Sequence, residues 1–315
     1  MREGVGRFIR MGSALVTHGG ISFRQSDFSF ETYALRSLYL LAEIFGSSNV
    51  GLIRQDNQDS FLIANLETGD IATIAAPSMV SAHTAPFILV VADGVGGAAS
   101  GALASSIATE TLLAELHRWW HKVPKRDRES IAACLRKAID TANKAIYQKA
   151  HGASEHHGMG TTTTLALVVD SNVHIAQVGD SRAYLIRGGS ARQVTKDQSF
   201  VQRLIDAGRM TAREAEQSEH RNIILQALGP EEKVTCDLYH EKLESADFLV
   251  LCSDGLSNQI SAEDIAGITR GAARPEEICA ALIEEAMHTG APDNVTVVAA
   301  RIRSPEADYL EVLNN

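Results

Sequence analysis

The order of expected strands and helices predicts an α+β fold, in which two β-sheets pack together and pairs of helices cover them. Two observations lead to this fold class. Expected strands follow one another with turn signals between them, such as Asp170-Ser171-Asn172 and Gly188-Gly189, which indicates hairpins. Amphipathic helices come in pairs instead of alternating with single strands, which argues against a βαβ succession.

Apolar periodicity and turn residues place the individual elements. The run Phe87-Ile88-Leu89-Val90-Val91 is continuously apolar, which is typical of a strand covered on both faces. The expected strands are residues 60–65, 86–92, 162–169, 173–178, 183–187, 193–195, 234–240, 248–252 and 295–302. The expected helices are residues 100–120, 128–150, 262–270 and 275–288.

We expect one domain, over residues 46–305, which contains all the expected strands and helices. Residues 1–45 form an N-terminal extension that we expect to be partly disordered, and residues 306–315 form a short acidic tail. Residues 197–229 are charged and interrupt the strand pattern with short helices, so we expect them to form an excursion from the sheets.

Charge and cysteine usage narrow the class of protein. The formal net charge of -10 argues against non-specific nucleic-acid binding and against a polybasic membrane contact. No apolar stretch reaches the length of a membrane span, since the best candidate, residues 33–45, is interrupted by Arg36 and Glu43. The four cysteines lack paired spacing, which argues against a zinc finger or a disulfide framework. We therefore expect a cytoplasmic protein without membrane insertion.

Five aspartates adjoin apolar strands of the expected sheets. Asp93 and Asp254 each precede a glycine where a buried strand ends, and Asp180 follows a third strand. Asp59 and Asp293 stand at the start of two further strands. Each aspartate alone is typical of turn chemistry. If the two sheets pack face to face, however, the five carboxylates would gather and repel one another unless a cation lay between them.

Carboxylate oxygens without histidine or cysteine favour a hard cation, Mn²⁺ or Mg²⁺. Gly94, directly after Asp93, would allow a backbone carbonyl to approach the same ion. Several carboxylates serving two ions predict a binuclear centre, which can activate a water molecule for phosphoester hydrolysis.

The segments around these aspartates resemble, in order, the motifs of the metal-dependent Ser/Thr protein phosphatases of type 2C, in particular the bacterial single-domain members. The resemblance covers about residues 50–303 and rests on residues 49–61, 91–97, 158–162, 178–184, 225–229, 251–256 and 293–296. It implies a four-layer α-β-β-α sandwich of two antiparallel sheets flanked by helix pairs, with residues 197–229 as the flap beside the active site. It also implies hydrolysis of phosphoserine and phosphothreonine in proteins, in signal transduction that opposes a Ser/Thr kinase.

The resemblance also assigns roles to individual residues. Two core ions would be held by Asp59, Asp93, Asp254 and Asp293, with Asp93 bridging them and Gly94 contributing its carbonyl. Asp180 would join Asp254 at a third, weaker metal site. Arg54 would bind the substrate phosphate, for which its planar guanidinium is suited. The alternative for Arg54 is a surface ion pair with a neighbour such as Asp56.

Three positions depart from the pattern of the family. Val95 stands where animal members carry a histidine proposed as general acid, so water on the metal becomes the expected proton source, with His220 as a weaker candidate. Gln198 replaces a common histidine, and Gln58 replaces a common glutamate beside the first metal aspartate. None of these departures removes an expected direct ligand.

Other classes of function were weighed against this one. Residues 94–99 match the dinucleotide-binding pattern G-x-G-x-x-A, but Asp93 would repel a pyrophosphate and no second βαβ strand follows. A catalytically silent binding module of the same fold and a phosphatase for small phosphoesters remain as alternatives.

Overall fold

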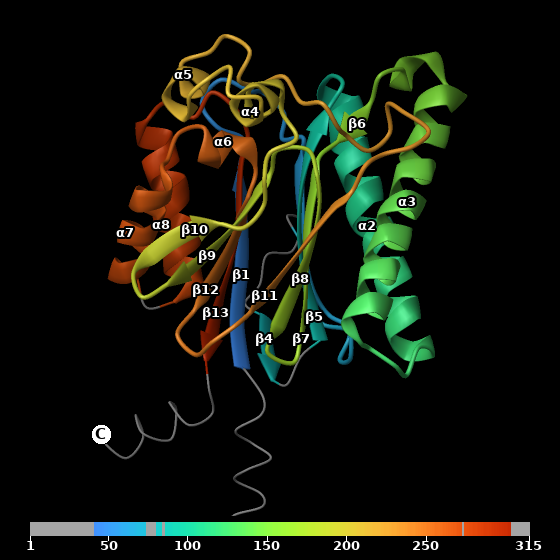
Figure 1. The fold of residues 1–315 in the computed structure, drawn as a ribbon. Coiled ribbons are helices and arrows are strands. Elements are labelled where there is room, and N and C mark those ends of the chain that lie inside the picture. The colour runs from blue at the N-terminus through green and yellow to red at the C-terminus, as the bar shows by residue number, and fades with distance from the viewer. Residues whose placement is uncertain (1–40, 74–79, 84–85, 273, 304–315) are drawn as a thin grey trace, which may run out of the picture. The chain divides into compact units, whose positions relative to one another are not determined.

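The computed structural model describes residues 41–73, 80–83, 86–272 and 274–303. Two antiparallel sheets form its centre (Figure 1). The order of the first sheet is β10-β9-β12-β13-β1-β4. Its strands are β1 (Leu41–Asn49), β4 (Val80–His83), β9 (Arg182–Arg187), β10 (Ser190–Gln193), β12 (Phe248–Cys252) and β13 (Val295–Arg303).

The second sheet has the order β11-β8-β7-β5-β2-β3, with the short β6 paired to β5. Its strands are β2 (Asp59–Asn65), β3 (Ile71–Thr73), β5 (Pro86–Val95), β6 (Gly160–Thr161), β7 (Thr163–Val169), β8 (Asn172–Val178) and β11 (Asp237–Lys242). All the strand pairs of both sheets are antiparallel.

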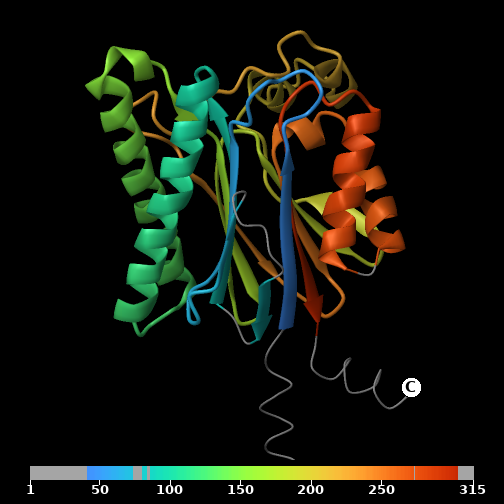
Figure 2. The ribbon, with the colours of Figure 1, turned by 180° about the vertical axis from the view of Figure 1, so that it is seen from behind.

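Helix pairs cover the outer faces of the two sheets, as Figures 1 and 2 show. The helices α2 (Ala98–Lys122) and α3 (Arg128–Gly152) lie on the second sheet, and α7 (Ala262–Gly271) and α8 (Pro275–His288) lie on the first. Asp127 caps α3 by accepting a hydrogen bond from the backbone N–H of Ser130, which satisfies one of the free donors of its first turn. The predicted four-layer α-β-β-α sandwich is confirmed.

Three apolar clusters lie between the four layers. Ile44, Phe61 and Leu89 belong to the cluster between the two sheets. A second cluster joins α2 and α3 to the second sheet, and a third joins α7 and α8 to the first. Because alternate residues of β5 serve the first two clusters, the strand is apolar along its whole buried length, as its sequence predicted.

The segment between β10 and β11 carries two short helices, α4 (Phe200–Asp206) and α5 (Ala212–Glu216), at one end of the sandwich (Figure 1). We call residues 197–229 the flap. Ser199 caps α4, and Thr211 caps α5 through a reciprocal capping box with Glu214. A further short helix, α6 (Asp254–Ser257), follows β12 after one intervening residue.

Several expected boundaries were wrong. Residues 41–45 were assigned to the N-terminal extension, but they begin β1, which lies beside β13 within the first sheet (Figure 2). Strands β3 and β4 were not predicted, and β10 and β11 are shifted from the expected 193–195 and 234–240. Most of the expected extension and the whole tail lie outside the described residues. Among the helices that are described, none combines the length and hydrophobicity needed to cross a bilayer.

Candidate active site

Four of the five aspartates line one cleft, of about 690 Å³, at the end of the sandwich that carries the flap. The cleft is also lined by Arg54, Gly94 and the flap residue Ile224. Its aspartates are Asp93, Asp180, Asp254 and Asp293. They come from the end of β5, the turn after β8, the first turn of α6 and the residues before β13, so the packing of the two sheets brings distant parts of the sequence together.

Asp59 lies beneath the cleft and is 4% exposed. It stands opposite Asp93 in the β2–β5 pair. Its Oδ2 accepts hydrogen bonds from Ser253 Oγ at 2.8 Å and from Thr296 Oγ1 at 2.6 Å, whereas its buried Oδ1 has no partner among the described residues. Burial raises the pKa of Asp59 to about 7, although the two hydroxyl donors oppose the shift. A buried, unpartnered carboxylate oxygen at this position fits a ligand to a cation.

Asp93 is held by its backbone. Its N–H donates to Thr162 Oγ1 at 3.1 Å, and its carbonyl accepts from Thr162 N at 2.8 Å and Thr161 Oγ1 at 2.9 Å. Burial, then the charges of Asp59 and Asp254, raises its pKa well above the ordinary range. Both causes, burial and repulsion between the carboxylates, would be offset by a cation bound among them.

Burial and neighbouring negative charges also raise the pKa values of Asp180 and Asp254. Asp180 is 6% exposed, and burial followed by the charge of Asp254 raises its pKa well above the ordinary range. Burial and the charge of Asp293 raise the pKa of Asp254, while the neighbouring side chain of Asp93 and the positive charges of Arg182 and Arg54 oppose the rise.

Gly94 is fixed by close backbone packing. A Cβ there would lie 2.2 Å from the carbonyl oxygen of Gly101 in α2 and 2.7 Å from that of Gln58. A residue with a side chain would therefore push α2 away from β5, so glycine is required by helix approach in addition to its expected role toward a metal.

Arg54 and Asp293 form an ion pair at the rim of the cleft. Arg54 Nε donates to Asp293 Oδ1 at 2.9 Å and Nη2 donates to Oδ2 at 2.7 Å. The partner of Arg54 is thus an expected metal ligand and not the sequence neighbour Asp56. The guanidinium side chain remains 50% exposed, so it faces the solvent from which a phosphate would enter.

The donor set fits hard divalent cations, since it consists of carboxylates and backbone oxygens. In the described part of the chain, no three His, Cys, Asp or Glu side chains already form a ready coordination group. The carboxylate of Asp293 is turned toward Arg54. The unpartnered Oδ1 of Asp59 is an oxygen that a cation could bind.

Residues 54–277 match the sequence profile described as protein phosphatase 2C. The chain belongs to the protein phosphatase 2C family. It is 37% identical over 211 residues to the serine/threonine phosphatase stp of Listeria welshimeri, which covers 67% of this chain and 82% of that protein. It is similar to the solved serine/threonine phosphatase of S. agalactiae, with a TM-score of 0.71, 31% identity and coverage of 82% of this chain and 99% of that one.

A further solved relative contains metal. The catalytic domain of the serine/threonine protein phosphatase PstP in complex with two manganese ions has a TM-score of 0.67 and 34% identity to this chain, covering 84% of this chain and 99% of that one. These relatives of the protein phosphatase 2C family are hydrolases named for serine and threonine phosphatase activity.

Residues that support the family's aspartates were not singled out from the sequence. Ser253 and Thr296 fix Asp59, as described above, and Ser253 Oγ also accepts from the backbone N–H of Thr296 at 3.0 Å. Asn294 Oδ1 accepts from Gln58 N, and its Nδ2 donates to the carbonyls of Val50 and Asp56, which holds the loop that carries Arg54. Two signals in the sequence were available: Ser253 directly precedes Asp254, and Thr296 is a polar residue within the otherwise apolar start of β13.

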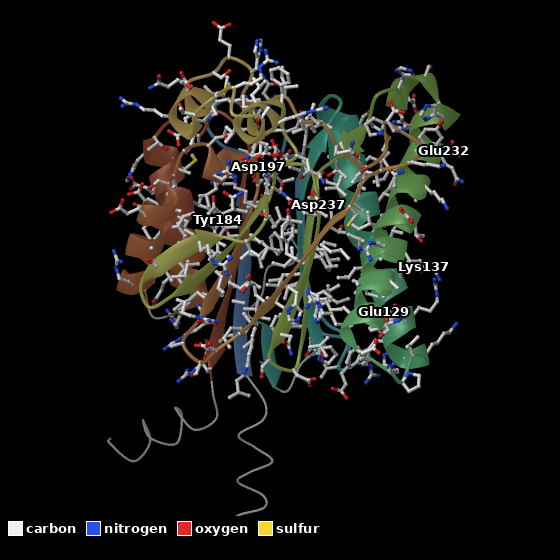
Figure 3. The ribbon with its side chains drawn as sticks, in the orientation of Figure 1. Glu129, Lys137, Tyr184, Asp197, Glu232 and Asp237 are labelled. Atoms are coloured by element: carbon white, nitrogen blue, oxygen red, sulfur yellow. The ribbon has the colours of Figure 1, made fainter. Side chains whose placement is uncertain are left out.

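Gln198 ties the flap to the sheets. Its Oε1 accepts from the backbone N–H of Gly179, directly before Asp180, while its Nε2 donates to Asp237 Oδ2 at 2.9 Å. Beside it, Asp197 forms a three-bonded ion pair with Arg182 of β9, with bonds of 2.7 to 3.1 Å. Figure 3 shows Asp197 and Asp237 at the end of the sheets next to the flap. The glutamine at the position of a common histidine is therefore a structural anchor.

The structure does not support His220 as a proton donor in the cleft. Its ring contacts that of Phe200, with centroids 5.8 Å apart, and it is not among the residues that line the cleft. Val95 does line the cleft, and no histidine among the described residues does.

Proposed function

We propose that this protein is a metal-dependent phosphatase that hydrolyses phosphoserine and phosphothreonine in proteins. The observation that carries the proposal is the group of desolvated carboxylates around the unpartnered Oδ1 of Asp59, with the Arg54 guanidinium at the rim of the same cleft. Carboxylates for cations and a guanidinium for phosphate are the two binding functions that such a reaction requires.

We assign two core Mn²⁺ or Mg²⁺ ions to Asp59, Asp93, the carbonyl of Gly94, Asp254 and Asp293. The manganese complex of PstP supports this assignment. When bound, such ions lower the pKa of water and neutralise charge on a phosphate. Asp180, beside Asp254 in the cleft, would contribute to a third site.

Other residues of the site would bind the phosphate and orient the metal ligands. Arg54 would orient the phosphate by two parallel hydrogen bonds, as it now orients the carboxylate of Asp293. Ser253 and Thr296 would keep Asp59 in one orientation. The cleft is open to solvent and is lined in part by the flap residues Asn222 and Ile224, so that a phosphorylated segment of a protein could enter it beside the flap.

Domain limits, location and partners follow from the same proposal. We assign the catalytic domain to residues 41–303, with residues 197–229 as the flap. We place its action in the cytoplasm, against proteins phosphorylated by a Ser/Thr kinase, the kinase itself included. The four free cysteines agree with a reducing compartment.

Metal titration of chelator-treated protein tests the proposal. Mn²⁺ should restore hydrolysis of a phosphothreonine peptide, and Asp93→Asn should reduce that activity at least about a hundredfold, since it removes a direct ligand. A protein that stays inactive with every substrate would be a binding module. A protein that prefers sugar phosphates to phosphopeptides would be a phosphatase for small phosphoesters. Either result would overturn the proposal.

A further inference from the structure

A smaller pocket, of about 240 Å³, lies between α3 and the β8–β11 edge of the second sheet. Four of its lining residues carry either a positive charge or an imidazole that can donate a hydrogen bond. Arg128 and Arg136 come from α3, His174 from β8 and His240 from β11. No carboxylate lines this pocket, although the chain as a whole has a net charge of -10. A local excess of cationic groups on an acidic protein indicates an anionic ligand.

The two arginines are available to such a ligand. Both are exposed, and within the described residues neither forms an ion pair or a hydrogen bond. They stand eight residues apart on one helix, a little over two turns, which places them on the same side of α3. Arginine forks bind phosphate oxygens by paired, charge-assisted hydrogen bonds.

His174 is the second, independent sign of a ligand. It is 6% exposed, it lines the pocket, and its imidazole has no hydrogen bond within the described structure. Its ring meets that of His240 edge to face, with centroids 4.7 Å apart. The ring nitrogens of His174 are not among the buried side-chain atoms that lack a partner, so they are accessible at the pocket. An imidazole that has no protein partner and lines a pocket can bind a ligand from outside.

We propose that this pocket is a binding site for a compact phosphate anion, either inorganic phosphate or the phosphoryl group of a small metabolite. Arg128 and Arg136 supply charge and forked donors, and the imidazoles of His174 and His240 supply N–H donors from the sheet. The volume exceeds several times the roughly 30 Å³ of one water molecule, which leaves room for a phosphoryl group.

This site is separate from the aspartate cleft. His174 precedes Asp180 by six residues, which along a strand corresponds to roughly 20 Å. Its cross-strand neighbour Leu167 belongs to the core beneath α2 and α3, so the side chains at this register face the helices. The same pocket shares no lining residue with the cleft.

Side-chain NMR of the full chain tests the site without relying on catalysis. The protein is freed of metal by a chelator and carries Arg54→Ala, so that phosphate binding in the cleft is suppressed. Inorganic phosphate and methyl phosphate are titrated separately, and the imidazole signals of His174 and His240 are followed. We expect both signals to shift saturably. A response to inorganic phosphate alone identifies free phosphate as the ligand, and a response to both identifies the phosphoryl group.

Exposed arginines provide variants that should still fold. Arg136→Gln should raise the Kd about fivefold to tenfold, and Arg128→Gln with Arg136→Gln should abolish saturation. Lys137→Gln is the matched control, because it removes one positive charge from α3 at a residue outside the pocket lining (Figure 3); its Kd should stay within about twofold. Absence of saturable shifts, or an unchanged Kd in the double arginine variant, would overturn the proposal whether or not the protein is a phosphatase.

Discussion

Arg54 and Asp293, 239 residues apart in the sequence, are joined by two parallel hydrogen bonds at the rim of the cleft. One is the proposed phosphate ligand and the other a proposed metal ligand. A cation bound to Asp293 would compete with Arg54 for the carboxylate charge, so metal binding should weaken this ion pair and make the guanidinium available to the phosphate. The pair would then couple occupation of the metal centre to binding of the substrate.

Arg54→Ala should reduce kcat/KM for a phosphopeptide about 10- to 100-fold, since it removes a charge-assisted pair to the phosphate. It should leave the affinity for Mn²⁺ unchanged or higher, because Asp293 loses a competing partner. Steady-state kinetics and calorimetric Mn²⁺ titration measure the two effects separately.

Two further variants serve as controls for the effects of Arg54→Ala on kcat/KM and on Mn²⁺ affinity. Arg54→Lys keeps the charge but loses the fork, so it should recover only part of the lost kcat/KM. Asp293→Asn should weaken Mn²⁺ binding, in contrast to Arg54→Ala. If Arg54→Ala bound Mn²⁺ more weakly than the parent protein, the coupling argument would be wrong.

The hydroxyls that hold Asp59 lead to a second prediction. Ser253→Ala and Thr296→Val each remove a donor to Asp59 Oδ2, at 2.8 and 2.6 Å respectively. Groups that orient a metal ligand typically change metal affinity or activity 10- to 100-fold when removed, so each variant should raise the Mn²⁺ Kd about tenfold. Calorimetric titration measures this change.

Ser106→Ala is a suitable control for these two substitutions. Ser106 lies on α2 and donates to Glu110, away from the aspartates. Its removal should leave Mn²⁺ affinity as in the parent protein. Equal Mn²⁺ affinity in Ser253→Ala, Thr296→Val and this control would mean that Asp59 needs no such support.

The local pattern of apolar residues was sufficient to predict a strand that is buried on both faces, as in the run Phe87–Val91 of β5. It was insufficient for β1, where only alternate residues such as Ala42 and Ile44 are buried and the pairing partner is far away in sequence, with Leu41 opposite Arg303. Strand β11 is only partly buried along its length, so its sequence lacks a clear apolar period.

The aspartates themselves were predictable because a motif surrounds each one. The Arg54–Asp293 bond was not, because it depends on which partner each side chain meets after folding. The same holds for Ser253 and Thr296, whose role requires that β12 and β13 lie side by side beneath Asp59. Sequence alone thus indicated the candidate ligands, and tertiary packing decided which residues contact them.

Gly94→Ala should destabilise the protein by about 3 kcal/mol or more and abolish activity, because a Cβ would lie 2.2 Å from the Gly101 carbonyl oxygen. Urea unfolding followed by circular dichroism measures the stability. Gly152→Ala is the matched control, since a Cβ there meets no atom within 4 Å. Wild-type stability in Gly94→Ala would show that α2 can move away from β5 at little cost.

His174 should make the stability of the protein sensitive to mild acid. Burial, then electrostatic interaction with His240 on β11 and with Arg128 on α3, lowers its pKa to about 4, below the ordinary histidine value of about 6.5. Below the ordinary value the unfolded chain binds the proton more readily than the folded one. Stability from the neutral imidazole is therefore present above pH ~6.5, and it is lost as the pH falls toward ~4.

His174→Asn should consequently flatten the pH dependence of the free energy of unfolding between pH ~6.5 and ~4. Urea unfolding in phosphate-free buffer measures the slope, which is informative even if the variant is less stable at every pH. His117→Asn, at an exposed position of α2, should keep the parental slope. If His174→Asn also kept the parental slope, the prediction would be wrong. The imidazole of His174 would then not be the group that makes stability depend on pH in this range.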